Sequence, residues 1–181
     1  MPQNLNTIQT AQHPVSAKYR VLVLCTGNSA RSVMAEALFN CAGKWFQAYS
    51  AGSHPVGRVN PFALEQIEAL GCDPNSYRSK NWFEFAEQQT PSLDFVITVC
   101  DNAAGERCPD FPGAPQRVHW SFPDPAATTG TADQVRRSFS RCFDALRIRV
   151  ETLSSLPLDT MDKRQIAKTM QQLANEPMGH S

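Results

Sequence analysis

Short, almost continuous apolar runs alternate along this chain with longer segments in which apolar residues recur every three or four positions. The runs are short and include β-branched residues, as is typical of strands buried on both faces of a sheet. They occupy residues 19–24, 46–50, 93–99 and 117–120. We therefore expect four strands.

Helical periodicity follows the first, second and fourth runs, and one more helical stretch lies near the C-terminus. Asn60 and Pro61 are typical of an N-cap and a first helical turn, and Gly71 is typical of a helix end. Thr131 and Gln134 form a capping box ahead of a long helix. The apolar stripes are Met34, Ala37, Leu38; Leu64, Ile67, Leu70; Val135, Phe139, Cys142, Leu146, Val150, Leu153; and Ile166, Met170, Leu173.

This alternation predicts an α/β fold with three layers, in which a four-stranded parallel sheet carries helices on both faces. A chain of 181 residues, 41% of them hydrophobic, is expected to enclose one core. We expect a flexible N-terminal tail over 1–18, the domain over 19–155, and a C-terminal helical extension and tail over 156–181. Residues 101–116 form an irregular connector, of a length that is often functional.

The charge balance narrows the class of partner. Seventeen basic and 17 acidic side chains cancel, which argues against nucleic acid or a membrane surface as the partner. No apolar stretch is long enough for a membrane helix or a signal peptide, so we expect a cytoplasmic protein. Six cysteines are too sparse for a disulfide-stapled domain, and in a reducing compartment they are either buried and inert or chemically active.

Cys25 directly follows the first strand, at the carboxyl edge of the sheet where ligands bind. The next five residues are small, and two of them, Gly27 and Asn28, tolerate positive φ, so that successive backbone N–H groups can converge on an anion. A helix beginning near Arg31 adds its positive end, and the guanidinium can bind two oxygens at once. The predicted site for a tetrahedral oxyanion comprises Thr26, Gly27, Asn28, Ser29, Ala30 and Arg31.

The same surroundings bear on the sulfur of Cys25. A thiol beside an arginine at a helix N-terminus is expected to ionise near neutrality, with Ser32 as a hydroxyl donor to it. The alternative is that Cys25 is a small buried hydrophobe at a strand end. Neither nucleotide-binding glycine loop is present, which disfavours a nucleotide hydrolase.

A carboxylic acid is needed above such a loop, because an oxyanion oxygen leaves readily only as water or an alcohol. Asp124 follows the fourth strand on the same edge, between Pro123 and Pro125. It is the candidate general acid. The other interpretation is that Asp124 only initiates a turn.

The segment Cys25-Thr-Gly-Asn-Ser-Ala-Arg31-Ser32 resembles the C-x5-R-S loop of the low-molecular-weight protein tyrosine phosphatase superfamily. The likeness covers roughly residues 19–155 and is closest to the arsenate reductase branch, through residues 49–52, 96–101 and 119–126. It implies a phosphatase-like fold, arsenate as the substrate with phosphate or sulfate as mimics, and Asp124 as the acid. No tightly bound cofactor or metal is expected.

Arsenate reduction needs two electrons, so a second thiol must act after Cys25. Cys100 ends the third strand, the expected sheet neighbour of the first. Neighbouring strands lie about 4.8 Å apart, a separation that a disulfide tolerates. The resemblance implies that Cys108 then takes the oxidation from Cys100 and presents it to thioredoxin. Because the spacing between these two cysteines is one residue longer than in the thioredoxin-coupled pattern, and Ala30 stands where many relatives carry a cysteine, glutathione with glutaredoxin remains an alternative reductant. Inert cysteines at 100 and 108 are the other alternative.

Several side chains have plainer interpretations. Cys41, Cys72 and Cys142 are expected to pack in the core. His119 and Trp120 are expected to pack beneath the edge of the sheet. A zinc site of Cys100, Cys108 and His119 matches no common spacing and is disfavoured. Asn28, Glu36 and Ser50 stand where relatives can bind potassium, but we expect a structural network there.

Two other functions remain open at this point. One is a low-molecular-weight protein tyrosine phosphatase using Cys25, Arg31 and Asp124. It is disfavoured because Ala126 and Ala127 follow where phosphatases place aromatic residues, although residual activity on aryl phosphates is expected. The other is an oxyanion-binding sensor, in which binding would survive substitution of Cys25.

Overall fold

The computed structural model describes residues 18–42 and 44–176, so the predicted N-terminal tail lies outside the described residues except for Lys18. The strands are β1 (Tyr19–Cys25), β2 (Phe46–Gly52), β3 (Phe95–Thr98) and β4 (Gln116–His119). The α-helices are α1 (Arg31–Ala42), α2 (Pro61–Ala69), α3 (Asp101–Gly105), α4 (Ala132–Ser155) and α5 (Lys163–Asn175). Short 3-10 helices are η1 (Pro74–Ser76), η2 (Trp82–Phe85), η3 (Pro125–Ala127) and η4 (Leu158–Thr160).

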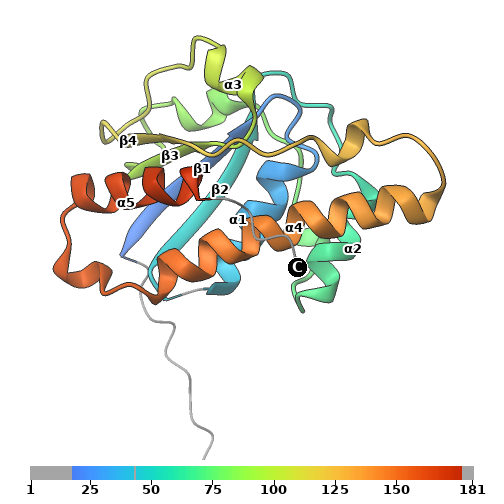
Figure 1. The fold of residues 1–181 in the computed structure, drawn as a ribbon. Helices are drawn as coiled ribbons and strands as arrows, with labels where there is room; N and C mark the ends of the chain where they lie inside the picture. The colour runs from blue at the N-terminus through green and yellow to red at the C-terminus, as the bar shows by residue number, and fades with distance from the viewer. Residues whose placement is uncertain (1–17, 43, 177–181) are drawn as a thin grey trace, which may run out of the picture.

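The four strands form one sheet in the order β2-β1-β3-β4, with all neighbours parallel. This confirms the predicted parallel sheet and places β3 next to β1. The carboxyl ends of all four strands therefore meet at one edge, where α3 also lies (Figure 1). The connector over 101–116 was expected to be irregular throughout, but it begins with the short helix α3.

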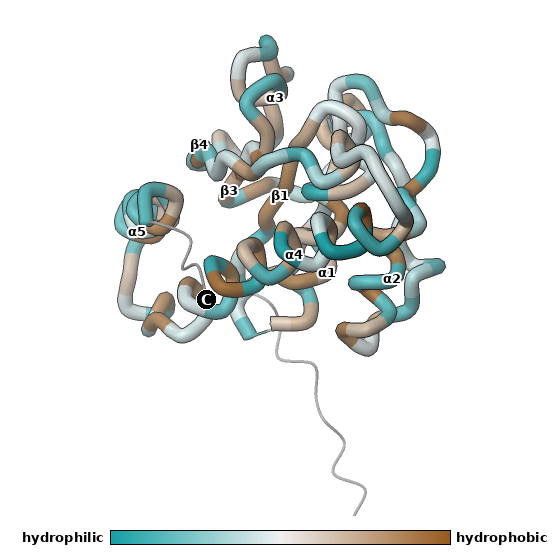
Figure 2. The backbone as a smooth tube through the Cα atoms, turned by 45° about the vertical axis from the view of Figure 1, so that its right-hand side comes forward, coloured by the Kyte–Doolittle hydropathy of each residue, from teal (hydrophilic) through white to brown (hydrophobic). Residues whose placement is uncertain are grey.

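Alternate residues of the central strands face two separate cores. Val21 and Val23 pack with α1, α4 and α5 in the larger one. Leu22 and Leu24 face the smaller core on the other side of the sheet, where the cover is η2 and loop residues such as Phe111. The predicted three-layer α/β architecture is thus confirmed, with a second layer built of a 3-10 helix and loops. In Figure 2 the tube is largely hydrophobic along β1, whereas hydrophilic and hydrophobic residues alternate along α4 and α5.

The helix signals in the sequence act as predicted. The side chain of Asn60 accepts the N–H of Phe62 at the start of α2, and Gly71 ends this helix with φ +86°. Thr131 and Gln134 form both bonds of the capping box of α4. These local signals fix where the two helices begin.

The C-terminal extension is helical, and its described part packs on the sheet. Ile166, Met170 and Leu173 are buried in the larger core. Trp120, also buried there as predicted, donates from its indole nitrogen to the Met170 carbonyl at 2.8 Å. None of the helices in the described part of the chain has the length and apolarity needed to cross a membrane.

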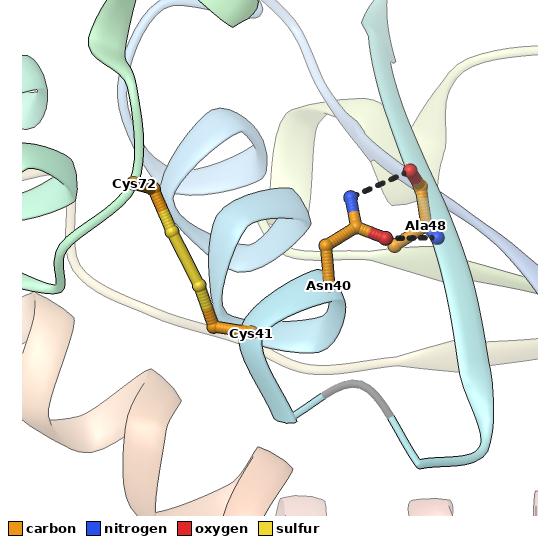
Figure 3. Close-up of a disulfide and its surroundings, with 4 residues drawn as sticks. All are labelled: Asn40, Cys41, Ala48 and Cys72. Atoms are coloured by element: carbon orange, nitrogen blue, oxygen red, sulfur yellow. Dashed lines mark hydrogen bonds between the residues drawn. A yellow bond between two sulfur atoms is a disulfide. The ribbon is translucent and has the colours of Figure 1, made fainter. Parts of the chain in front are cut away.

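An amide side chain is bonded to each outer strand of the sheet. Asn40 of α1 accepts the N–H of Ala48 at 2.8 Å and donates to its carbonyl at 3.0 Å (Figure 3). Gln171 of α5 pairs in the same way with His119, at 3.2 and 3.3 Å. The side chains thus occupy backbone groups on the open sides of β2 and β4.

The expectation that Cys41 and Cys72 only pack in the core is wrong. They form a disulfide that joins the last turn of α1 to the residue after Gly71 (Figure 3). No local pattern indicates this pairing, because 31 positions separate the two residues. Cys142 is buried on the apolar stripe of α4, as predicted.

Candidate active site

The loop after β1 is held from outside through its carbonyl groups. Thr26, Gly27 and Ser29 accept backbone N–H groups of the segment 54–60 at 2.9, 3.0 and 2.8 Å, respectively. Gly52, at the end of β2, is needed for this approach, since a Cβ atom there would lie 2.4 Å from the Thr26 carbonyl oxygen. With their carbonyls turned outward, these peptide groups present their N–H groups to the side of Cys25.

Asn28 organises the interior of the loop. Its φ is +42°, in the left-handed region, as predicted, whereas Gly27 does not adopt a positive φ. The fully buried Asn28 accepts the backbone N–H of Lys80 at 2.7 Å, which fixes the orientation of its amide. Its Nδ2 then donates to the hydroxyls of Ser32 and Ser50, both at 2.9 Å.

This arrangement orients a donor at the sulfur of Cys25. Ser32 Oγ lies 2.9 Å from Cys25 Sγ, and because it accepts from Asn28, its own hydrogen is available to the sulfur. The backbone N–H groups of Asn28 and Ser32 also point to this sulfur. All three bonds favour the thiolate.

The expected ionisation of Cys25 near neutrality is not what the surroundings produce. Burial raises the pKa of the thiol, and the bonds from Ser32 and the backbone lower it by less. Arg31 does not assist, because its Nη1 donates to the Phe122 carbonyl at 2.9 Å and its Nη2 lies 3.4 Å from Asp124. The prediction from sequence weighed the cation and the helix end but not the loss of water around the sulfur.

Asp124 lies beside Arg31 at the mouth of the loop and is solvent-exposed. The carboxylate also accepts the N–H of Ala126 at 3.1 Å and so caps η3. Asp124 therefore initiates a turn, as the alternative interpretation held. This turn leaves the other carboxylate oxygen facing the guanidinium of Arg31.

A buried ion pair lies behind Ser50. The Ser50 hydroxyl donates to Glu36 at 2.5 Å, and the ammonium of Lys80 lies 3.4 Å from the same carboxylate oxygen. Burial raises the pKa of Glu36 and lowers that of Lys80, while their mutual attraction opposes both shifts. The residues considered for potassium thus form a hydrogen-bonded network that contains its own cation. Lys80 was missed, since it lies 44 positions from Glu36 and has no local signal.

Cys100 lies close to the loop that carries Cys25, as the predicted strand order required. It follows β3 and is 4% exposed, and its sulfur lies 3.6 Å from the Thr26 hydroxyl. The sulfur also accepts the N–H of Ala103 at 3.4 Å, at the start of α3. Repulsion between the two neighbouring sulfurs adds to the effect of burial in raising the pKa of Cys25. The structure therefore places a second buried thiol beside the oxyanion loop.

Cys108 is set apart from this pair. It is half-buried and packs against the smaller core, whereas Cys25 and Cys100 belong to the larger one. It lines a cavity of about 270 Å³ together with Glu106, Arg117, His119 and others. Burial raises the pKa of Cys108, and the guanidinium of Arg117 opposes this.

His119 does not pack beneath the sheet edge as expected. Its ring nitrogens lie 2.8 Å from the Thr98 hydroxyl and 3.0 Å from the Asp101 carboxylate, in the wall of the same cavity. Hydrogen bonds from Ser121 and His119 lower the pKa of Asp101. Within 18–42 and 44–176, no group of three or more His, Cys, Asp or Glu side chains is arranged to hold a metal ion.

Comparison with known proteins finds one matching family and several similar enzymes. Residues 20–172 match the family model described as low molecular weight phosphotyrosine protein phosphatase. An arsenate reductase of Halalkalibacterium halodurans is 36% identical over 135 residues, which cover 74% of this chain and 94% of the relative. The crystal structure of arsenate reductase from Archaeoglobus fulgidus aligns with TM-score 0.57 and 27% identity, over 75% of this chain and 99% of that one. An arsenate reductase in the phosphate binding state aligns with TM-score 0.59 and 27% identity, over 76% and 97% of the two chains.

Proposed function

The chain belongs to the low molecular weight phosphotyrosine protein phosphatase family, and from this premise we propose that it is an arsenate reductase. One observation favours reduction over hydrolysis. A second buried thiol, Cys100, lies against Thr26 of the oxyanion loop, and hydrolysis has no use for it. The relatives named as arsenate reductases support the same activity.

We propose that arsenate binds to the N–H groups of residues 26–30, with Arg31 closing over two of its oxygens. Phosphate is the expected mimic, and a related arsenate reductase was solved in a phosphate binding state. For this, Arg31 exchanges its bond to the Phe122 carbonyl for one to the oxyanion. Asp124, already beside the guanidinium, then lies above the bound anion.

The first step joins sulfur to arsenic. As the sulfur attacks, the proton of the Cys25 thiol passes by way of the bound arsenate to the carboxylate of Asp124. Asp124 returns this proton to the departing arsenate oxygen, which leaves as water. In balance, the thiol and H₂AsO₄⁻ give Cys25–S–AsO₃H⁻ and H₂O. Burial disfavours the free thiolate, so the Ser32 hydroxyl and the loop N–H groups stabilise the charge as the proton leaves.

The second step reduces arsenic. We propose that the thiol of Cys100 attacks the sulfur of Cys25, so that the S–As bond breaks and its electron pair leaves with arsenic as H₂AsO₃⁻. The two thiols supply the two electrons and become a Cys25–Cys100 disulfide. The proximity of Cys100 to the loop supports this assignment.

Cys108 is proposed to carry the oxidation to the surface. Exchange with the disulfide of Cys100 requires the segment that includes α3 (Asp101–Gly105) to move, because Cys108 packs against the other core. A half-buried thiol beside an open cavity is suited to meet an external reductant. Thioredoxin, or glutaredoxin with glutathione, then restores the dithiol in the cytoplasm.

The test follows NADPH oxidation that depends on arsenate, with thioredoxin and its reductase in one assay and glutathione with glutaredoxin in the other. Cys25→Ser should abolish turnover in both assays. Cys100→Ser should abolish arsenate reduction yet leave hydrolysis of a small aryl phosphate, whereas loss of both would contradict its role as a resolving thiol. Retention of turnover by Cys100→Ser and Cys108→Ser together would refute the relay.

A further inference from the structure

The Cys41–Cys72 disulfide has no part in the arsenate reaction described above. Cys41 lies in the last turn of α1 and is exposed, and Cys72 is half-buried. Figure 3 shows the bond spanning from α1 to the loop that follows α2, near the Asn40 amide that binds β2. Both sulfurs belong to segments at the outer surface of the larger core.

The disulfide links the two helices, α1 and α2, that begin next to the oxyanion loop. Helix α1 starts at Arg31, directly after the loop. Helix α2 starts after Asn60, whose N–H binds the Ser29 carbonyl at 2.8 Å. The two helices contact each other, and the disulfide joins their far ends, across a sequence separation of 31. Both supports of the loop are therefore covalently linked behind it.

We propose that Cys41 and Cys72 are a second dithiol–disulfide couple, independent of Cys25, Cys100 and Cys108, whose oxidation braces the two helices that support the oxyanion loop. The thiolate of one cysteine attacks a disulfide oxidant of the oxidised-glutathione class and forms a mixed disulfide. The other cysteine then displaces the glutathione thiol. In sum, two protein thiols and one glutathione disulfide give the Cys41–Cys72 bond and two glutathione thiols, and a dithiol reverses the change.

Exposure makes this couple exchangeable. The Cys41 side of the bond is open to an external thiol, which thiol–disulfide exchange requires. Cys142 offers the contrast, because it is buried on α4 and burial raises its pKa to about 12. Disulfides of cytosolic proteins, where they occur, are usually reversible and catalytic or redox-sensing. The exposed pair fits this class, and the buried single thiol does not.

The experiment uses the full chain with Cys25→Ser, Cys100→Ser and Cys108→Ser, so that neither turnover nor oxidation of the relay thiols contributes. Protein equilibrated in oxidised or reduced glutathione is alkylated and mapped without reductant. We expect one linkage, between Cys41 and Cys72, in the oxidised sample. Reduction with dithiothreitol should lower Tm by roughly 5–15 °C, given the length of the closed loop. Amide hydrogen exchange of residues 53–72 should become faster.

The matched control carries Cys41→Ser and Cys72→Ser in the same background. It should have the Tm of the reduced parent and should not respond to dithiothreitol. If this control does not fold, the parent measured in the two redox buffers still gives both readouts. Complete alkylation of both cysteines in oxidised glutathione would overturn the proposal, as would a linkage whose reduction changes neither Tm nor exchange. Arsenate reduction by the protein with Cys25, Cys100 and Cys108 intact is scored separately, so failure of one proposal does not imply failure of the other.

Discussion

Cys25 and Cys108 lie at the same end of the sheet but in very different surroundings. Cys25 is 4% exposed, and its sulfur accepts from Ser32, which Asn28 orients. Asn28 is itself fixed by the backbone of Lys80. Cys108 borders an open cavity and has one cation, Arg117, beside it. The difference matches two chemical demands: developing charge is best stabilised by fixed dipoles, whereas thiol exchange with a partner needs access.

The largest expected effect comes from removing the arginine next to each cysteine in turn. Arg31→Gln should lower kcat/KM for aryl phosphate hydrolysis by roughly 10²–10³-fold, as for loss of one transition-state donor. The matched variant, Arg117→Gln, removes the cation next to Cys108 and should leave that rate unchanged. Steady-state kinetics on both variants decides the matter. Equal losses of kcat/KM in the two variants would contradict a specific role of Arg31 in binding the oxyanion.

The rigidity of the first region can be tested at Asn28. Asn28→Gly keeps a residue that tolerates φ +42° but removes three buried hydrogen bonds, so unfolding free energy should fall by about 2–4 kcal/mol. Asn28→Ala should cost about 1 kcal/mol more, because its Cβ strains the left-handed conformation. Urea unfolding measures both. Wild-type stability in either variant would mean that the network does not hold the loop.

A smaller effect is expected for Ser32→Ala, read from pH dependence. The Ser32 hydroxyl lowers the pKa of Cys25 against the effect of burial, so its removal should raise that pKa further. The thiolate is the nucleophile, so at any pH below the pKa a smaller fraction is ionised and the rising limb of kcat/KM shifts to higher pH. A rise of one unit makes the rate at neutral pH about tenfold lower. A limb that stays in place, or shifts to lower pH, would contradict the donor role of Ser32.

The smallest predicted change concerns Cys108. Arg117 lowers the pKa of this thiol, so Arg117→Gln should raise it and slow alkylation of Cys108 by iodoacetamide at pH 8 about threefold. Peptide mapping over time gives the rate for each cysteine. Alkylation of Cys25 in the same sample is the internal control and should not change. Faster modification of Cys108 would show that Arg117 shields the thiol more than it activates it.

Features with a local signature were predictable. The four apolar runs became the four strands, and Asn60, Gly71 and Thr131 ended or began helices where expected. The proposal for Cys100 rested on the third strand lying beside the first, and the pairing of β1 with β3 confirms this. Loop residues from Cys25 to Ser32 were found because they are consecutive.

Features that depend on distant residues were not predictable. Lys80 reaches Asn28 across 52 positions, and Cys41 meets Cys72 across 31. The pKa of Cys25 was predicted in the wrong direction, since the depth of burial is a property of the whole fold. Arg31 was expected to act on the sulfur of Cys25, but its guanidinium donates to the carbonyl of Phe122, 91 positions away.

The amides of Asn40 and Gln171 bear on how the protein behaves at high concentration. A strand from a neighbouring molecule that approached β2 or β4 would find Ala48 or His119 already bonded through both its N–H and its carbonyl. It would have to displace a helix-borne side chain before pairing, and fibrous stacking of sheets starts from such open edges. Two ordinary amides thereby oppose polymerisation of the sheet on both sides.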